Sequence, residues 1–190
     1  MIIKDLVSEV AEQHSLEREF FLLAFRNDHI ARHALPGHFL MVSPAEPGGP
    51  LLRRPFGILE VNPPKSSVLI YYQRVGSGTG RLSSLKPGDP LRVLGPLGNG
   101  FQSFSGRRIL LVAGGRGIAP LIFAARRLAA GNRVVLLYGA PTAAKLHLRD
   151  RIRTLDLADV RYCTEDGSLG SKGMVTDHIG EIVDRHRIDV

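Results

Sequence analysis

The segment Leu111-Val-Ala-Gly-Gly-Arg-Gly-Ile-Ala-Pro120 decides the fold of the second half of this 190-residue chain. The apolar run Arg108–Ala113 leads into the glycines, and Ile118–Ala130, with helical composition, follows them. A buried parallel strand that turns through glycines into a helix is typical of an α/β fold. Backbone N–H groups at the start of such a helix bind phosphates, and glycine lets the phosphate come close.

The spacing of the glycines differs from the Rossmann fingerprint. Gly115 and Gly117 match its first two glycines, but Pro120 stands where the third would be. The second strand ends in Leu137-Tyr-Gly-Ala140, without an acid to bind a ribose. Proline is well suited to the first turn of a helix. The segment predicts a phosphate-type loop, and a purely structural glycine turn is the alternative.

Strands and helices alternate through the rest of the second half. The expected strands are Arg108–Ala113, Arg133–Tyr138, Val160–Cys163 and the beginning of another at Ile188–Val190. The expected helices are Ile118–Ala130, Leu146–Leu155 and Val175–His186. This alternation predicts a doubly wound parallel sheet over residues 105–190, incomplete at its C-terminus.

The first half consists of short β-rich runs separated by turn-forming stretches. The expected strands are Ile2–Val10, Glu19–Phe25, His38–Ser43, Phe56–Val61, Val68–Gln73 and Pro90–Leu94. The expected turns are Pro44–Pro50, Asn62–Ser67 and Lys86–Asp89. Six such strands predict a small antiparallel β-barrel over residues 1–104, with one helical turn at Thr79–Leu85.

Composition and charge exclude several classes of protein. The net charge is +7, with 11 basic and 9 acidic side chains in residues 1–104 against 14 and 9 in residues 105–190. The chain contains neither a run of five basic residues nor a Trp, so a nucleic-acid function has little specific support. The single Cys163 excludes an intramolecular disulfide and a multi-cysteine metal site. Neither a signal peptide nor an 18-residue apolar run is present, so we expect a cytoplasmic location and no membrane contact.

Two segments of the first half offer further phosphate contacts. Leu51-Leu-Arg-Arg-Pro-Phe-Gly-Ile58 carries adjacent arginines on a strand, so at most one of them faces a given site. A basic pair on an edge strand is the alternative. Tyr72-Gln-Arg-Val-Gly-Ser-Gly-Thr79 leads from a strand into a helix start with free N–H groups and a hydroxyl. There the alternative is a flexible turn with Thr79 as the helix N-cap.

A fourth segment, Gly95-Pro-Leu-Gly-Asn-Gly-Phe101, predicts a tight turn after the last barrel strand. The order of the four segments resembles the ferredoxin-reductase superfamily. Leu51–Pro55, Gly95–Phe101 and Thr164–Gly173, followed by Val175-Thr-Asp177, most resemble the electron-transfer subunits of NAD-dependent dihydroorotate dehydrogenase. The resemblance spans nearly the whole chain, and the combined motifs are specific although each alone is weak.

The resemblance implies an FAD-binding barrel, residues 1–104, and an NAD(P)-binding α/β domain, residues 105–190. It places the FAD contacts at Arg54, Pro55, Phe56, Gly57, Tyr72, Gln73, Arg74, Gly78 and Thr79. Arg54 would face the FAD pyrophosphate. The pyridine nucleotide would bind at Gly114, Gly115, Gly117, Ala119 and Pro120, with Thr164 and Asp166 near its adenosine.

The sequence departs from the family pattern in two places. Gly57 stands where the family has Ser or Thr, so a hydroxyl contact to the cofactor is lost. Related chains continue beyond a strand like Ile188–Val190 into a Cys-Gly-Pro segment and a cysteine-rich 2Fe–2S module. A [2Fe–2S] cluster needs four cysteines, so it is expected only in a longer form of this chain, and the recorded chain is expected to be truncated or a degenerate relative.

The function that the resemblance implies is electron transfer from NADH through FAD to an iron–sulfur centre and a catalytic dehydrogenase subunit, in pyrimidine biosynthesis. The flavin carries the chemistry, so no side chain is assigned as a catalytic acid or base. The choice between NADH and NADPH stays open. Alternatives are a reductase subunit of a hydrogenase, a ferredoxin:NADP oxidoreductase or an oxygenase, and a cofactor-poor interaction module.

His29, His33 and His38 are expected on loops or the barrel surface, Cys163 is expected as a packed thiol, and no metal site is expected.

Overall fold

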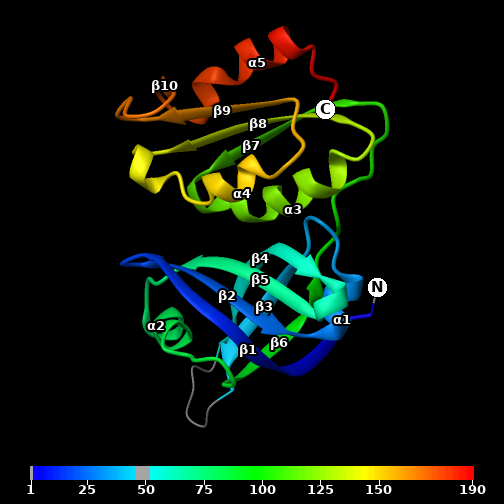
Figure 1. The fold of residues 1–190 in the computed structure, drawn as a ribbon, viewed down its shortest axis with the longest axis vertical. Coiled ribbons are helices and arrows are strands. Elements are labelled where there is room, and N and C mark those ends of the chain that lie inside the picture. Colours follow the sequence, from blue (N-terminus) through cyan, green and yellow to red (C-terminus); the bar gives the residue numbers. More distant parts are fainter. Residues whose placement is uncertain (1, 46–51) are drawn as a thin grey trace. The chain divides into compact units, whose positions relative to one another are not determined.

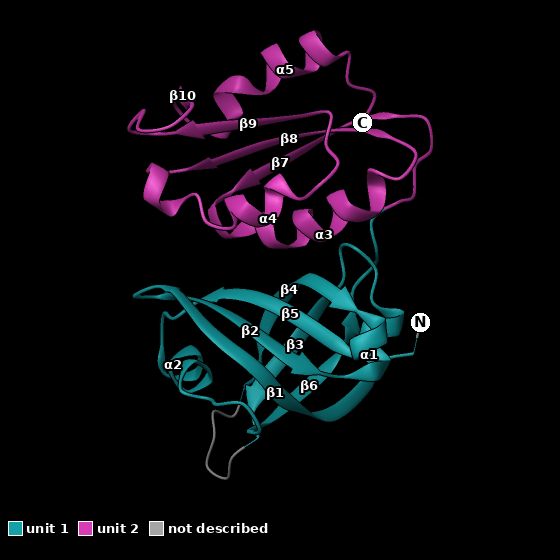
Figure 2. Cartoon of the chain, in the orientation of Figure 1, with its two compact units in different colours: residues 1–101 teal, residues 102–190 magenta. Residues whose placement is uncertain are grey.

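The computed structural model describes residues 2–45 and 52–190, and it divides into two units, residues 1–101 and 102–190 (Figure 2). The turn expected at Pro44–Pro50 falls mostly outside the described residues, as does Leu51 of the arginine-containing segment. Each unit has its own sheet and its own core.

Within the described residues, unit 1 forms a closed barrel with the strand order β1-β2-β5-β4-β3-β6 (Figure 1). Its strands are β1 Lys4–Glu17, β2 Phe20–Arg26, β3 Phe39–Pro44, β4 Arg54–Asn62, β5 Ser67–Gln73 and β6 Pro90–Leu97. Its helices are α1 Asp28–His33, α2 Ser77–Ser83 and the 3-10 helix Pro63–Lys65. Apolar side chains alternate into the barrel, as half-buried antiparallel strands require. The predicted antiparallel barrel is therefore confirmed.

Two parts of the barrel differ from the sequence prediction. β1 continues to Glu17, because its second half pairs with β2 through two irregular steps in register, although Ala11–Glu17 is rich in polar residues. Cross-strand pairing here outweighs weak β-propensity. The helix α1 was not predicted, because six residues are too few to show helical periodicity. Asn27 does cap it, with its Oδ1 accepting a hydrogen bond of 2.9 Å from the N–H of Ile30.

Unit 2 contains a parallel sheet with the strand order β10-β9-β8-β7. The strands are β7 Arg108–Gly114, β8 Arg133–Ala140, β9 Asp159–Thr164 and β10 Ser171–Lys172. The helices are α3 Ile118–Leu128, α4 Arg149–Arg153, α5 Ile179–His186 and the 3-10 helices Gly115–Gly117, Ala143–Lys145 and Val175–His178. Figure 1 shows α3 and α4 on one face of the sheet and α5 on the other. The doubly wound arrangement is confirmed.

The structure corrects the limits of three elements in unit 2. The helix expected at Leu146–Leu155 is limited to α4, because Leu148 has a left-handed backbone with φ of 65° that interrupts a helix. The helix expected at Val175–His186 begins as a 3-10 segment. Ile188–Val190 forms no strand, although it runs along β7. The Asp189 N–H donates to the Arg108 carbonyl over 2.8 Å, and the Leu110 N–H donates to the Val190 carbonyl over 2.9 Å.

Ile182 packs α5 against the sheet, so shortening the Ile182 side chain is expected to destabilise unit 2. Its buried side chain packs with Val135, Leu137 and Cys163. Ile182→Ala is expected to lower the free energy of unfolding by about 2–5 kcal/mol, because it leaves a cavity between helix and sheet. Urea unfolding followed by circular dichroism measures this. Asp184→Ala, on the exposed side of the same helix, is the control and should change stability by less than about 0.5 kcal/mol. Equal effects would contradict the role of Ile182.

Candidate functional site

The two adjacent arginines of the motif diverge, and Arg54 is the one that reaches the glycine turn. Arg53 Nη2 donates to both carboxylate oxygens of Asp5, over 2.9 and 2.7 Å. The Arg54 guanidinium lies against Gly78 in α2, so that a Cβ added to Gly78 would come within 2.6 Å of Arg54 Nη2. Arg54 Nη1 also donates to the Leu52 carbonyl. Strand alternation predicted that at most one of the two arginines would face a given site, and in the structure Arg54 is the one that faces the glycine turn.

The glycine turn closes into the helix α2, and Thr79 has a different place in it than expected. The helix begins at Ser77 with Gly76 as its N-cap, so Thr79 is the third helical residue and not the cap. Its hydroxyl accepts from the N–H groups of Val75 and Gly76 over 2.9 and 3.2 Å. The N–H groups of the first helical turn have no intrahelical partners, and Gly78 in this turn lies against the Arg54 guanidinium. A guanidinium beside such N–H groups is a donor set suited to a pyrophosphate.

Two aromatic residues near this site, Phe56 and Tyr72, lie on the neighbouring strands β4 and β5 and differ in exposure. Tyr72 is 2% exposed, and its hydroxyl accepts from Gln13 Nε2 over 3.0 Å. The partly exposed ring of Phe56 lies 5.5 Å from the Tyr72 ring. Tyr72 therefore packs beside Phe56 and does not present a surface of its own. Along β4, Pro55 pairs with Met41 and Gly57 pairs with Phe39.

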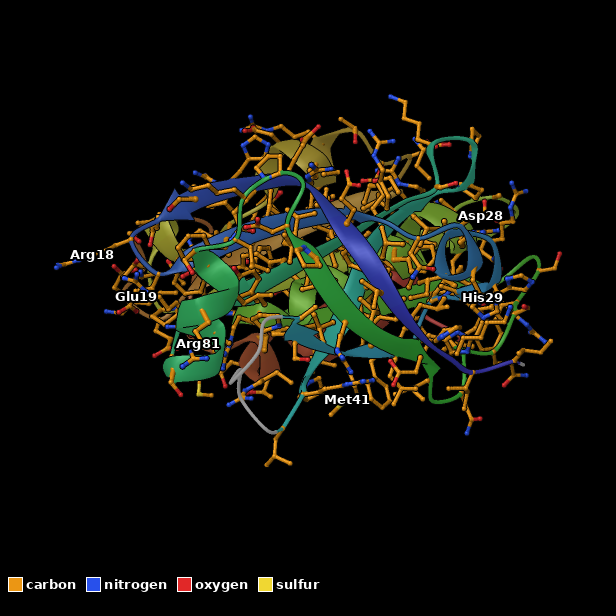
Figure 3. All side chains as sticks on the ribbon, turned by 90° about the horizontal axis from the view of Figure 1, so that it is seen from below. Arg18, Glu19, Asp28, His29, Met41 and Arg81 are labelled. Carbon is orange, nitrogen blue, oxygen red and sulfur yellow. The ribbon has the colours of Figure 1, made fainter. Side chains whose placement is uncertain are left out.

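The end of β5 brings Gln73 and Arg74 next to the β1–β2 turn. Gln73 Nε2 donates to Glu19 Oε2 over 3.3 Å, and the Arg74 N–H donates to the Glu19 carbonyl over 2.7 Å. Figure 3 shows Arg18 and Glu19 on the same side of the barrel as Arg81 of α2. Val75, which follows Arg74, is 72% exposed and was not among the predicted site residues, because only its place in the turn could have indicated it.

Burial of Tyr72 makes a testable prediction about its ionisation. Burial raises the pKa of Tyr72 to about 12, with the hydrogen bond from Gln13 acting against this effect. A raised pKa in the folded state contributes stability below pH 10, the ordinary value, and this contribution is lost as the pH rises through about 12. Titration of the folded protein at 295 nm should show a tyrosine that ionises near pH 12 and is absent in Tyr72→Phe. Ionisation of every tyrosine near pH 10 in folded protein would contradict this.

The loop Gly114–Gly117 joins β7 to α3 at the carboxyl edge of the parallel sheet. Gly115 has φ of 51°, a left-handed backbone that favours glycine. Gly114 and Gly117 have φ of −112° and −60°, which any residue adopts. A Cβ added to any of the three glycines would meet no atom within 4 Å. Packing within the chain therefore does not explain Gly114 and Gly117, whereas a ligand that approaches the loop would.

The glycines of Gly95–Phe101 have a different explanation. A Cβ on Gly95 would come within 2.6 Å of Leu40 Cδ2, and one on Gly98, whose φ is 81°, within 3.1 Å of the Phe39 ring. The Phe101 N–H donates to the Pro36 carbonyl over 2.8 Å. This segment is a packed turn against the start of β3, so its glycines are explained by the barrel itself.

The other residues predicted to bind the pyridine nucleotide lie in the first turn of α3 or at the end of β9. Ala119 is buried in the first turn of α3 and can face a ligand only through its backbone, and Pro120 is the third helical residue, in the first turn as expected. Thr164 is fully buried, with its hydroxyl donating to the Leu169 carbonyl and accepting from the Leu169 N–H, both over 3.0 Å. It therefore shapes the turn after β9.

Asp166 lies in that turn and is exposed. Its carboxylate accepts from the hydroxyl and the N–H of Ser168 over 2.6 and 2.9 Å, and these bonds hold its pKa below the ordinary value. Gly114 pairs with Gly139 at the end of β8, and Ala140 pairs with Thr164 at the end of β9. The glycine loop and the Asp166 turn thus share one edge of the sheet, where ligands of open α/β sheets bind.

Other candidate residues are structural. His38 lies in the turn before β3, and its side chain is buried there, with its Nδ1 accepting from the Leu35 N–H over 3.0 Å. Burial lowers the pKa of His38. Cys163 is a packed thiol, as predicted. Among residues 2–45 and 52–190, no group of three or more His, Cys, Asp or Glu side chains is arranged to hold a metal ion. No helix in the described part of the chain is long and apolar enough to cross a membrane.

Comparison with known proteins supports the family indicated by the motifs. No family model matches the chain. It is 35% identical over 176 residues to the dihydroorotate dehydrogenase B (NAD(+)) electron transfer subunit of Shouchella clausii, covering 90% of this chain and 67% of that protein. It is 35% identical over 184 residues to the corresponding subunit of Bacillus mycoides, covering 95% and 69%. The chain thus spans about two thirds of the length of these relatives.

A solved structure of an NADH-dependent reduced ferredoxin-NADP oxidoreductase, from a study of flavin-based electron bifurcation, superposes with a TM-score of 0.82 at 29% identity. The match covers 93% of this chain and 63% of that one. Its fold agrees with the barrel and the parallel sheet described above. The chain therefore belongs to the family of dihydroorotate dehydrogenase B (NAD(+)) electron transfer subunits, with a ferredoxin-reductase-like fold.

Proposed function

We propose that this chain is a flavoprotein component that binds FAD in unit 1 and a pyridine nucleotide in unit 2, and that it passes electrons between a dihydroorotate dehydrogenase and that nucleotide. The single observation that carries the proposal is the contact between the Arg54 guanidinium and Gly78 in the first turn of α2. These two residues are far apart in the sequence and adjacent in the barrel. When bound, FAD supplies the conversion of a two-electron hydride into single electrons.

The residues of unit 1 would hold the cofactor at three places. Arg54 would form charge-assisted hydrogen bonds with the pyrophosphate, together with N–H groups of Gly78 and Thr79. Pro55, Phe56 and Gly57 of β4 would line the flavin, with Tyr72 packed beside Phe56. Gln73 and Arg74 would complete the site at the end of β5. No side chain is needed as an acid or base.

The residues of unit 2 would bind the pyridine nucleotide along the carboxyl edge of its sheet. Gly114, Gly115 and Gly117 would leave room for the pyrophosphate, and the first turn of α3, with Ala119 and Pro120, would direct its N–H groups toward it. Asp166 would lie on the adenosine side, in a turn shaped by Thr164. The family name, which includes NAD(+), supports NAD(H) rather than NADP(H) as the nucleotide.

The partner would be the catalytic subunit that the relatives' name implies, in a hetero-oligomer of pyrimidine biosynthesis. The 190 residues contain one cysteine, which is buried. A [2Fe–2S] cluster needs four cysteines, so we propose one only for a longer form of the chain.

The test is flavin binding by the purified protein. Reconstitution with FAD should give a yellow protein with a flavin spectrum after gel filtration, and anaerobic NADH should bleach it. A protein that retains no FAD after reconstitution would overturn the proposal and favour a cofactor-poor interaction module. Bleaching by NADPH but not by NADH would leave FAD binding intact and overturn the assignment of the nucleotide.

A further inference from the structure

The first arginine of the motif, Arg53, has no part in the proposed cofactor contacts, yet it is held firmly. Both oxygens of the Asp5 carboxylate accept from its Nη2, and the Arg53 side chain is only 20% exposed. Asp5 is the second residue of β1, whereas Arg53 immediately precedes β4. The barrel order separates these two strands by β3 and β6, so the ion pair joins strands that share no backbone hydrogen bonds.

The register shows where this ion pair lies. Asp5 pairs with Leu94 of β6, Leu94 with Met41 of β3, and Met41 with Pro55 of β4. This row of paired residues runs from Asp5 across β6 and β3 to Pro55, and Arg53, two residues before Pro55, reaches back across it to Asp5. The ion pair thus links the start of β4 to β1, which is separated from β4 by β3 and β6.

The backbone at this entry determines the direction of Arg54 from both sides. On the N-terminal side, Leu52 precedes Arg53, and its carbonyl accepts from Arg54 Nη1. On the C-terminal side, Pro55 restricts the backbone of Arg54 to extended conformations. The position of the Leu52 carbonyl depends on where Arg53 is held. Asp5 thus connects through Arg53 and Leu52 to the guanidinium that lies against Gly78.

We propose that Asp5 is a positioning residue for the phosphate-binding arginine: its ion pair with Arg53 holds the Leu52 carbonyl where it orients Arg54 toward α2. The inference rests on the proposed FAD site. It explains both arginines of the motif, because one would bind the cofactor and the other would hold the strand from which the first one projects.

Asp5→Asn gives a test in which the sign of the effect is decisive. FAD carries a negatively charged pyrophosphate, so removal of a nearby negative charge would tighten FAD binding if Asp5 acted only through its field. Loss of the positioning contact predicts the opposite, a dissociation constant raised about two- to fivefold, which is the range for a partly exposed ion pair. Fluorescence titration of the apoprotein with FAD measures it, and unchanged or tighter binding would overturn the proposal.

Three controls separate positioning from general stability. Asp5→Glu keeps the charge and should restore most of the affinity. Asp28→Asn breaks the Asp28–Arg32 pair, 2.7 Å long and similarly exposed at its acid, on α1 at the far side of the barrel from α2 (Figure 3). It should leave FAD affinity unchanged, and thermal unfolding of both apoproteins shows whether the two variants are equally stable.

The third control is Asp5→Asn in an Arg54→Ala background, where no further loss of affinity is expected because the residue to be oriented is gone. The same loss in both backgrounds would show that Asp5 acts elsewhere and would overturn the inference while leaving the FAD site intact. Failure of the unaltered protein to bind FAD would instead overturn the proposed function, and this inference with it.

Discussion

Arg54→Ala is expected to weaken FAD binding by about ten- to a hundredfold. A hydrogen bond to a charged group contributes roughly 1.5–3 kcal/mol, and Arg54 would make such bonds to the pyrophosphate beside the first turn of α2. The loss should appear as a raised FAD dissociation constant in apoprotein titrations and as flavin lost during gel filtration. Arg54→Lys should recover only part of the affinity, because an ammonium cannot bind a phosphate in the bidentate way.

The matched control is Arg53→Ala, one residue away on the opposite face. It removes an arginine of the same motif and the same charge, but its partner is Asp5 rather than the glycine turn. We expect an effect of no more than a few-fold, because Arg53 would act only by holding the strand. Equal retention of flavin by the two variants would show that Arg54 does not bind the phosphate.

Gly117→Val is expected to abolish reduction of the flavin by NADH while FAD stays bound. The backbone at Gly117 has φ of −60° and open space around it, so the variant should fold. The branched side chain would fill the space that a pyrophosphate needs at the start of α3. Anaerobic stopped-flow absorbance should show a flavin that NADH no longer bleaches.

Chemical reduction distinguishes a blocked nucleotide site from a damaged flavin site. Dithionite should reduce the flavin of Gly117→Val as completely as that of the unaltered protein, because it needs no nucleotide loop. Thermal unfolding should be nearly unchanged, in contrast to Gly115→Val, where φ of 51° makes any side chain strained. If NADH reduces Gly117→Val at the rate of the unaltered protein, the loop is only a structural turn.

The extent of each element could be predicted only where a local pattern spans it. The buried runs of β7 and β8 and the short β-rich runs of the barrel are visible because a strand's periodicity repeats within the segment itself. The second half of β1 and the two residues of β10 have no such pattern, and they are strands because a neighbouring strand pairs with them. Likewise, the capping signal at Asn27 is too local to establish α1 without its packing.

The sequence by itself determined the family, the organisation into a barrel and a parallel sheet, and the positions of the glycine-rich turns. It also established that adjacent arginines on a strand must diverge, since side-chain alternation is a local property. Only the tertiary structure decided which arginine turns toward α2, because that depends on barrel closure bringing residues far apart in sequence together. It also separated the glycines of Gly95–Phe101, which are needed for packing, from Gly114 and Gly117, whose surroundings are open. That distinction depends on what occupies the space near each Cα, and no local pattern contains that information.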